Sequence, residues 1–195
     1  MSPEAALPTR RLEEGASIVQ AKPWHTEPVS LDSPAVAVMT DLTQVKAATT
    51  GPSTSLHHAE QLMIYQGVRM LFVVTEMPSL VGLITTTDLR GDRAVRLVHE
   101  RGLHHDELTV GDVMTQLAQL DAVELDALRT ATVRNLIATL KRHGRNHLLV
   151  VEGGGATPLR VRGVISRAQI ERQLGTPIEL VEVAGSFAEL RQMLS

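Results

Sequence analysis

Apolar positions along the chain follow two periodicities, and the same succession of patterns occurs twice. In each half, apolar residues spaced three and four positions apart predict an amphipathic helix with one buried face. The residues on these faces are Leu56, Ala59, Leu62 and Met63 in the first half, and Val133, Leu136, Ile137 and Leu140 in the second. Two short apolar runs follow each helix and predict buried strands. These strands are expected at residues 70–74 and 80–85, and again at 147–152 and 161–165.

Each half also opens with a short β-type run and closes with a second helix. The opening runs lie around residues 45–50 and 120–125, and the closing helices are expected to start at residue 86 or 87 and at residue 166 or 167. A unit of this size is marginal alone and gains stability by burying its sheet against a neighbour. We therefore predict an α/β (α+β) fold in which two β-α-β-β-α units pack as one module with pseudo-two-fold symmetry.

Three short motifs show the duplication directly. VMT at residues 38–40 recurs at 113–115, GVRMLFVV from Gly67 recurs as GRNHLLVV from Gly144, and GLITTTDL from Gly82 recurs as GVISRAQI from Gly163. The order of the motifs is the same in both halves, which is typical of an internal repeat. The second half is longer mainly through a Gly- and Pro-rich segment between its two long strands, where a hairpin loop absorbs insertions at small cost.

Composition narrows the function classes. The chain has 195 residues, 43% of them hydrophobic, and a formal net charge of −3, so nothing in its charge favours nucleic acid or an anionic membrane surface. It has no cysteine, and no apolar run approaches the roughly 20 residues of a membrane span. We expect a cytoplasmic protein whose partners include neither nucleic acid nor a membrane.

Catalytic and metal-binding patterns are weak. The adjacent pairs His57/His58 and His104/His105 would point about 100° apart on a helix, so neither pair can bind one metal from one face. No nucleophile, base and orienting group can be assigned together. The sequence therefore predicts no metal site and no enzymatic activity.

The ordered motifs resemble those of a tandem pair of cystathionine-β-synthase (CBS) domains, also called a Bateman module, in a stand-alone protein of the bacterial type. The resemblance extends from about Ala35 to Leu174. It implies an N-terminal arm at residues 1–34, CBS domain 1 at 35–98, a linker at 99–109, CBS domain 2 at 110–174, and a C-terminal extension at 175–195. In that extension, IELVEV and the Ser186/Glu189 spacing predict an added strand and helix, which would either cover a sheet edge or take part in a dimer.

The resemblance also implies a function. CBS pairs commonly act as regulatory modules that bind AMP, ADP, ATP or S-adenosylmethionine between the two copies, with no cofactor required. The expected partners are a second copy of the chain in a homodimer, a small adenosyl ligand, and a regulated protein that the sequence does not identify. The alternative is an interaction or scaffold protein with vestigial CBS pockets. Met70 and Gln169 favour that alternative, whereas Thr85 and Asp88 oppose it.

Thr85 and Asp88 permit two interpretations. A carboxylate one turn into a helix can accept hydrogen bonds from both hydroxyls of a ribose, and a nearby threonine adds a further hydroxyl. The same spacing is close to the capping box, which satisfies free backbone N–H groups at the start of a helix. In the second copy Gln169 replaces the acidic residue, so the strong paired acceptor for a ribose is missing there, while Ser166 is retained as a residue that could contribute to a site.

The remaining candidate residues complete one composite site. We expect the strand edge around Thr49 and Thr50 to lie against the base of an adenosyl ligand. One or more of Arg69, Arg145 and His147, which lie at or just before the first long strand of each copy, are expected to contact phosphate.

Overall fold

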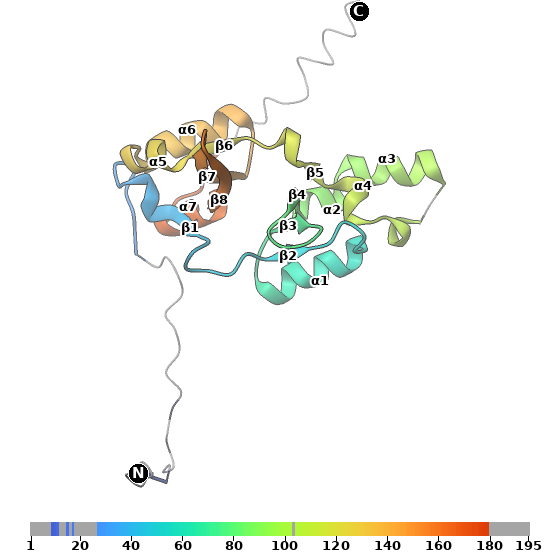
Figure 1. Cartoon of the computed structure of the whole chain (residues 1–195), viewed down its shortest axis with the longest axis horizontal. Helices are drawn as coiled ribbons and strands as arrows, with labels where there is room; N and C mark the ends of the chain where they lie inside the picture. The colour runs from blue at the N-terminus through green and yellow to red at the C-terminus, as the bar shows by residue number, and fades with distance from the viewer. Residues whose placement is uncertain (1–8, 12–14, 16, 18–26, 103, 180–195) are drawn as a thin grey trace, which may run out of the picture.

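The computed structural model describes residues 9–11, 15, 17, 27–102 and 104–179. In this part of the chain, two four-stranded sheets form two lobes, each with its own helices (Figure 1). One apolar cluster joins the facing sides of the two sheets through Met70, Phe72 and Leu83 from one and Leu149 and Val164 from the other. Two further clusters lie between each sheet and its helices. The predicted mixed α+β fold with paired units is confirmed.

The first lobe follows the predicted order. Its sheet runs β2 (Thr49–Thr50), β3 (Met70–Val74), β4 (Leu80–Thr85) and β5 (Thr115–Gln116). Its helices are α1 (Leu56–Gln66), α2 (Thr86–Arg90), α3 (Asp92–Arg101), η2 (His105–Glu107) and α4 (Val110–Val113).

The second lobe repeats this plan. Its sheet runs β1 (Met39–Asp41), β8 (Thr157–Ser166), β7 (His147–Gly154) and β6 (Ala122–Glu124). Its helices are η1 (Ala35–Val38), α5 (Leu125–Thr130), α6 (Val133–His143) and α7 (Arg167–Leu174). The short helix η3 (Leu117–Gln119) lies between β5 and β6 in the chain and contacts β4 of the first lobe.

Helices α1 and α6 form because apolar residues line one face of each. Of the eight predicted positions, six are buried: Leu56, Ala59, Met63, Val133, Leu136 and Leu140. Each helix ends at a glycine with positive φ, Gly67 at 65° and Gly144 at 58°. That left-handed conformation carries a steric penalty for residues with a Cβ atom, so a glycine ends each of these helices.

The boundaries differ from prediction mainly in the second hairpin. Strands β3 and β4 match the predicted ranges, whereas β7 extends to Gly154 and β8 begins at Thr157. Gly153, Gly154 and Gly155 all have positive φ, which lets the two strands stay paired up to a tight turn. The opening strands β2 and β6 are shorter than predicted.

The VMT segments exchange between the repeats. Strand β1 pairs with β8, placing Met39 opposite Ile165, and β5 pairs with β4, placing Thr115 opposite Leu83. Each VMT motif therefore completes the sheet of the other repeat. A Cβ atom on Gly82 would lie 2.5 Å from the Thr115 carbonyl oxygen, so this glycine admits the exchanged strand.

An ionic network holds β1 in place. Arg162 makes two hydrogen bonds to Asp41, Nε to Oδ1 at 2.9 Å and Nη2 to Oδ2 at 2.7 Å, and a third from Nη1 to Glu152 Oε2 at 3.0 Å. The hydrogen bonds from Arg162 hold the pKa of the Asp41 carboxyl well below its usual range, with Thr43 adding to the effect. Paired hydrogen bonds between charged groups are among the stronger polar contacts in proteins, so this network reinforces the exchange.

Two predictions lie partly or wholly outside the described residues. The Ser186/Glu189 spacing falls in the segment that the structure leaves undescribed, and so does most of the N-terminal arm. The described end of that arm packs on the second repeat, where Val29 N donates to Gln173 O at 3.0 Å and Arg134 pairs with Asp32 at 3.0 Å. Among the described residues, no helix has the length and apolar character needed to cross a membrane.

Candidate functional site

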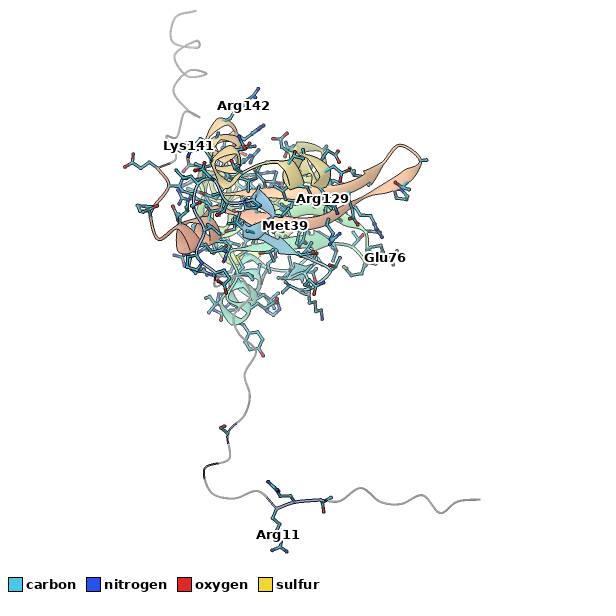
Figure 2. All side chains as sticks on the ribbon, turned by 90° about the vertical axis from the view of Figure 1, so that its left-hand side faces the viewer. Arg11, Met39, Glu76, Arg129, Lys141 and Arg142 are labelled. Carbon is cyan, nitrogen blue, oxygen red and sulfur yellow. The ribbon has the colours of Figure 1, made fainter. Side chains whose placement is uncertain are left out.

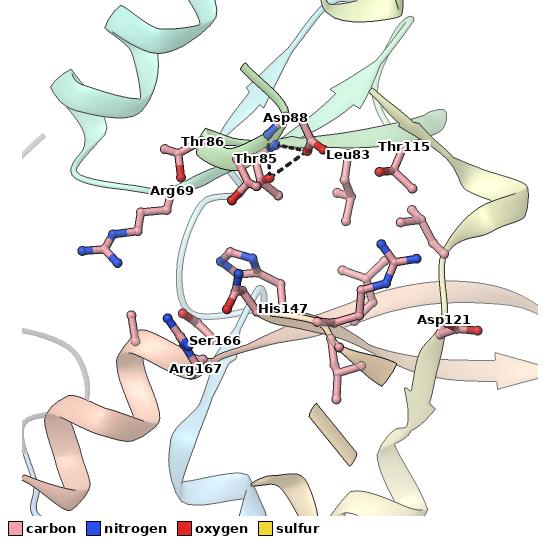
Figure 3. Close-up of a pocket in the computed structure, with 18 residues that line it drawn as sticks. Arg69, Leu83, Thr85, Thr86, Asp88, Thr115, Asp121, His147, Ser166 and Arg167 are labelled. Carbon is pink, nitrogen blue, oxygen red and sulfur yellow. Dashed lines mark hydrogen bonds between the residues drawn. The ribbon is translucent and has the colours of Figure 1, made fainter. Parts of the chain in front are cut away.

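A cavity of about 330 Å³ lies between the two repeats, where β4 and β8 end and β3 and β7 begin (Figure 3). The first repeat contributes Arg69, Thr85 and Asp88 to its lining. The second contributes Arg145, His147 and Ser166. The structure therefore brings together six of the eight residues selected from the sequence. The volume falls at the lower end of the range of small-molecule sites.

Thr85 and Asp88 form a complete capping box at the start of α2. The Thr85 backbone N–H and hydroxyl both donate to Asp88 Oδ2, at 2.8 and 2.7 Å, and Asp88 N–H donates back to Thr85 Oγ1 at 3.4 Å. The capping interpretation is thus confirmed for the first repeat. The other carboxylate oxygen, Oδ1, has no hydrogen bond to any described residue, so the cap leaves one acceptor of Asp88 available at the cavity.

The corresponding corner of the second repeat is built differently. Ser166 makes no side-chain capping hydrogen bond at the start of α7. Gln169 directs its side chain along its own helix, donating to Gln173 Oε1 at 2.9 Å and accepting from Arg172 Nη1 at 2.9 Å. Gln169 does not line the cavity, whereas Ser166 does. The second corner therefore offers no carboxylate to the cavity at this position.

Cationic groups reach the cavity from both repeats. Arg69 and Arg145 are exposed, line the cavity and form no ion pair with a described residue. Arg167, the first residue of α7, also lines the cavity, and the sequence analysis did not select it. The internal repeat could have revealed this residue. When TTTD at residues 85–88 is aligned with SRAQ at residues 166–169, Arg167 stands opposite Thr86, so the second copy has gained a positive charge.

His147 is half-buried at the start of β7, opposite Ser166. Its pKa is lowered to about 4, first by burial, and then by the positive charges of Arg69 and Arg167, while Asp88 acts in the opposite direction. The imidazole is therefore neutral at pH 7 and can donate one hydrogen bond and accept another. The equivalent residue in the first repeat is the buried Met70.

Thr49 and Thr50 lie on β2 and do not line this cavity. Thr50 pairs with Val73, which packs in the cluster beneath α1, and paired residues of neighbouring strands share a face of the sheet. The Thr50 hydroxyl is accordingly buried and has no hydrogen-bond partner among the described residues. The structure thus does not bring these two threonines to the other candidate residues.

No cluster of three or more His, Asp or Glu side chains suited to a metal ion occurs within the described ranges. The polar groups that line the cavity are instead hydroxyls, guanidinium groups, the His147 imidazole, the Asn146 amide, and the carboxylates of Asp88 and Asp121. This set can bind a ligand that carries both hydroxyl donors and an anionic group.

Comparison with known proteins identifies the domain type. Residues 36–93 match the family model of the CBS domain. An uncharacterized conserved protein from Pyrococcus horikoshii superimposes with a TM-score of 0.55 at 22% identity, over 78% of this chain and 100% of that chain. The CBS-domain containing protein ATU1752 from Agrobacterium tumefaciens gives 0.51 at 20% identity, over 68% of this chain and 88% of its own.

A structure of CBSX2, a CBS-pair protein from Arabidopsis thaliana, was solved in complex with AMP and gives a TM-score of 0.49 at 22% identity, over 72% of this chain and 94% of that one. No curated protein sequence gives a significant match. The segment 36–93 is therefore a CBS domain, and the fold of the described chain is that of a tandem CBS module.

Proposed function

We propose that this protein is a regulatory module that binds an adenosine-type ligand in the cavity between its repeats and passes the bound state to a separate protein. The observation that supports this most is the state of Asp88, whose one oxygen is held by Thr85 while the other is unengaged at a cavity that also contains arginines. The role is one of binding and regulation, not of catalysis.

Asp88 is suited to bind a ribose. Two hydrogen bonds from Thr85 fix the carboxylate before any ligand arrives, which reduces the ordering cost of binding. Hydrogen bonds from the ribose hydroxyls to this charged group would contribute about 1.5–3 kcal/mol each.

Arg69 and Arg145 are suited to bind phosphate. Both line the cavity without a carboxylate partner in the described part of the chain, and guanidinium groups match phosphate oxygens in geometry and charge. The same charges disfavour the sulfonium group of S-adenosylmethionine. Among adenosyl ligands we therefore favour AMP, ADP and ATP.

A ligand that contacts both repeats would regulate by stabilising one relative packing of them. We also propose that the protein acts as a cytoplasmic homodimer. Ile64 and Tyr65 at the end of α1 are 68% and 90% exposed, which gives this helix an apolar surface that a second copy could cover.

The test is ligand-dependent thermal unfolding of wild type and the Asp88→Asn variant. Asparagine keeps the cap, as the same protein shows at Thr132, whose N–H donates to Asn135 Oδ1 at 2.9 Å. It replaces the other carboxylate oxygen by an amide NH2 group, which removes both the charge and the acceptor that would face the ribose. Wild type with AMP at 100 times its dissociation constant should gain about 2.7 kcal/mol, and Asp88→Asn should bind at least tenfold more weakly.

Asp92→Asn, in the first turn of α3 and away from the cavity, is the matched control and should bind AMP as wild type does. Ligands lacking the 2′-hydroxyl should bind more weakly to wild type only. A flat response of wild type to millimolar AMP, ADP, ATP and S-adenosylmethionine would contradict the proposal and favour a scaffold role.

A further inference from the structure

A second cavity, of about 320 Å³, lies on the second repeat. It is formed by the second half of α6, the last residue of α7, residues 176–179, and one residue of the N-terminal arm. Most of its lining side chains are apolar, namely Leu31, Ile137, Leu174, Pro177 and Ile178. We call it the α6/α7 groove. No described residue lines both this groove and the cavity between the repeats, so the proposed function does not use it.

Hydrogen bonds hold the walls of the α6/α7 groove in place. Leu31 is fixed because its carbonyl oxygen accepts a hydrogen bond from Arg134 N at 2.9 Å. After α7 the chain turns at Gly175, which has a positive φ of 71°, and Ile178 N then donates to Glu171 Oε1 at 2.9 Å. The Ile178 side chain is 7% exposed, whereas Leu31 remains 38% exposed. The groove is therefore a preformed apolar surface that the described residues leave partly open.

The described chain leads directly into this groove. Glu179 lines it and is the last described residue, so residue 180 begins at its edge. Only residues 180–185 separate Glu179 from the helix that the sequence predicts from Ser186. Six residues span at most about 20 Å, and so short a tether gives the helix an effective concentration of millimolar order at its own groove.

The sequence of this predicted helix gives it one apolar face. After the capping-box residues Ser186 and Glu189, the positions that share a face are Phe187, Leu190 and Leu194, spaced three and four residues apart. A helix of about ten residues is marginal in water by itself and depends on tertiary packing of its apolar face. The predicted helix therefore requires an apolar surface, and the α6/α7 groove is within its reach.

The charges of the groove and of the segment are complementary. Lys141 lines the groove and Arg142 follows it on α6, and neither side chain forms an ion pair with another described residue. Residues 180–195 carry Glu182 and Glu189 near the predicted helix start, against a single basic residue, Arg191. Exposed ion pairs contribute little to stability, so these charges would orient the helix while apolar contact holds it.

We propose that residues 186–195 form a helix that packs its apolar face into the α6/α7 groove of the same chain. The groove provides the apolar surface that the short helix lacks, and the short tether favours the chain's own groove over that of a second copy. Because Leu31 belongs to the N-terminal arm, the docked helix joins the two ends of the chain on the second repeat. This role differs from both roles expected from the sequence, which were to cover a sheet edge or to take part in a dimer.

The test is the rate of thiol labelling in the full chain, which has no cysteine of its own. Lys141→Cys places a thiol at the groove. Arg142→Cys is the matched control, because it removes the same charge at a side chain that is exposed and points away from the body of the protein (Figure 2). We expect a bulky maleimide to label Lys141→Cys at least tenfold more slowly than Arg142→Cys. Adding Leu190→Glu, which charges the apolar face, should abolish this difference.

Two further variants separate docking from a general effect of mutation. Gln192→Glu adds the same charge to the opposite face of the predicted helix, and Leu190→Met keeps the docking face apolar, so labelling of Lys141→Cys should stay slow in both. It should also stay slow after 100-fold dilution of the protein. Equal labelling of the two thiols, or slow labelling that Leu190→Glu does not relieve, would overturn the proposal. Protection lost on dilution would overturn it as well, in favour of a second copy in the groove.

Discussion

The first and second repeats differ at the corner between their last long strand and the helix that follows. In the first, Thr85 caps α2 and Asp88 faces the cavity. In the second, Ser166 forms no cap, Arg167 faces the cavity, and Gln169 binds along its own helix. Beneath both corners the strands are equally buried, since Ile84 and Ile165 are each 0% exposed. The apolar core preserves the duplicated backbone, so the polar corners can diverge without loss of the fold.

The largest expected effect tests whether the apolar cores of the two repeats are equally well packed. Ile84→Ala and Ile165→Ala each remove a fully buried side chain and should each lower the free energy of unfolding by about 2–5 kcal/mol. Urea unfolding followed by circular dichroism would measure both. A loss below about 1 kcal/mol for one variant alone would show that the repeats are not equally packed.

The next effect is a loss of stability in acid, which depends on His147 and which its counterpart in the first repeat, Met70, cannot cause. Folding lowers the pKa of His147 from near 6.5 to about 4, so the unfolded state binds more protons and stability should fall as the pH drops from about 6.5 to 4. The loss should reach up to about 3 kcal/mol. His147→Met, which copies the first repeat, should flatten this slope.

His57→Met on the exposed side of α1 is the control and should retain the wild-type slope. Below about pH 4 all three proteins should lose further stability, because the Asp41 carboxyl takes up a proton in the unfolded state, whereas the hydrogen bonds from Arg162 hold its pKa far lower in the folded state. If the stability of wild type and of His147→Met fell equally between pH 6.5 and 4, the pH dependence could not be assigned to His147.

The smallest effect tests the difference between the capped start of α2 and the uncapped start of α7. Thr85→Ala removes the side-chain capping hydrogen bond of α2 and should lower stability by about 1 kcal/mol. Ser166→Ala removes a hydroxyl that caps nothing, so its change should stay within about 0.5 kcal/mol. Thermal unfolding without ligand measures both, and equal losses would show that the corners do not differ in this way.

Periodicity and repetition were sufficient to predict the long strands and the main amphipathic helices. The strands at 70–74 and 80–85 and the buried faces of α1 and α6 agree with the structure because side-chain alternation and local apolar spacing determine them. Thr85 with Asp88 was also identifiable, since a capping box is a local pattern. The two interpretations of that pair turned out to be compatible, because the cap engages one carboxylate oxygen.

Other features depend on contacts between residues far apart in the chain. The pairing of β1 with β8 joins residues 39–41 to residues 163–165, and Thr50 lies beneath α1 instead of at the cavity. Arg167 gains its significance only because the fold sets it near His147 and across from the first repeat.

The sequence by itself thus determined the two repeats, their main helices and long strands, and most of the candidate residues that line the cavity, because these follow from short-range patterns. Tertiary structure decided which strand completes which sheet and which polar groups share one cavity. The physical reason is that these arrangements depend on the packing of one repeat against the other, which local spacing does not encode.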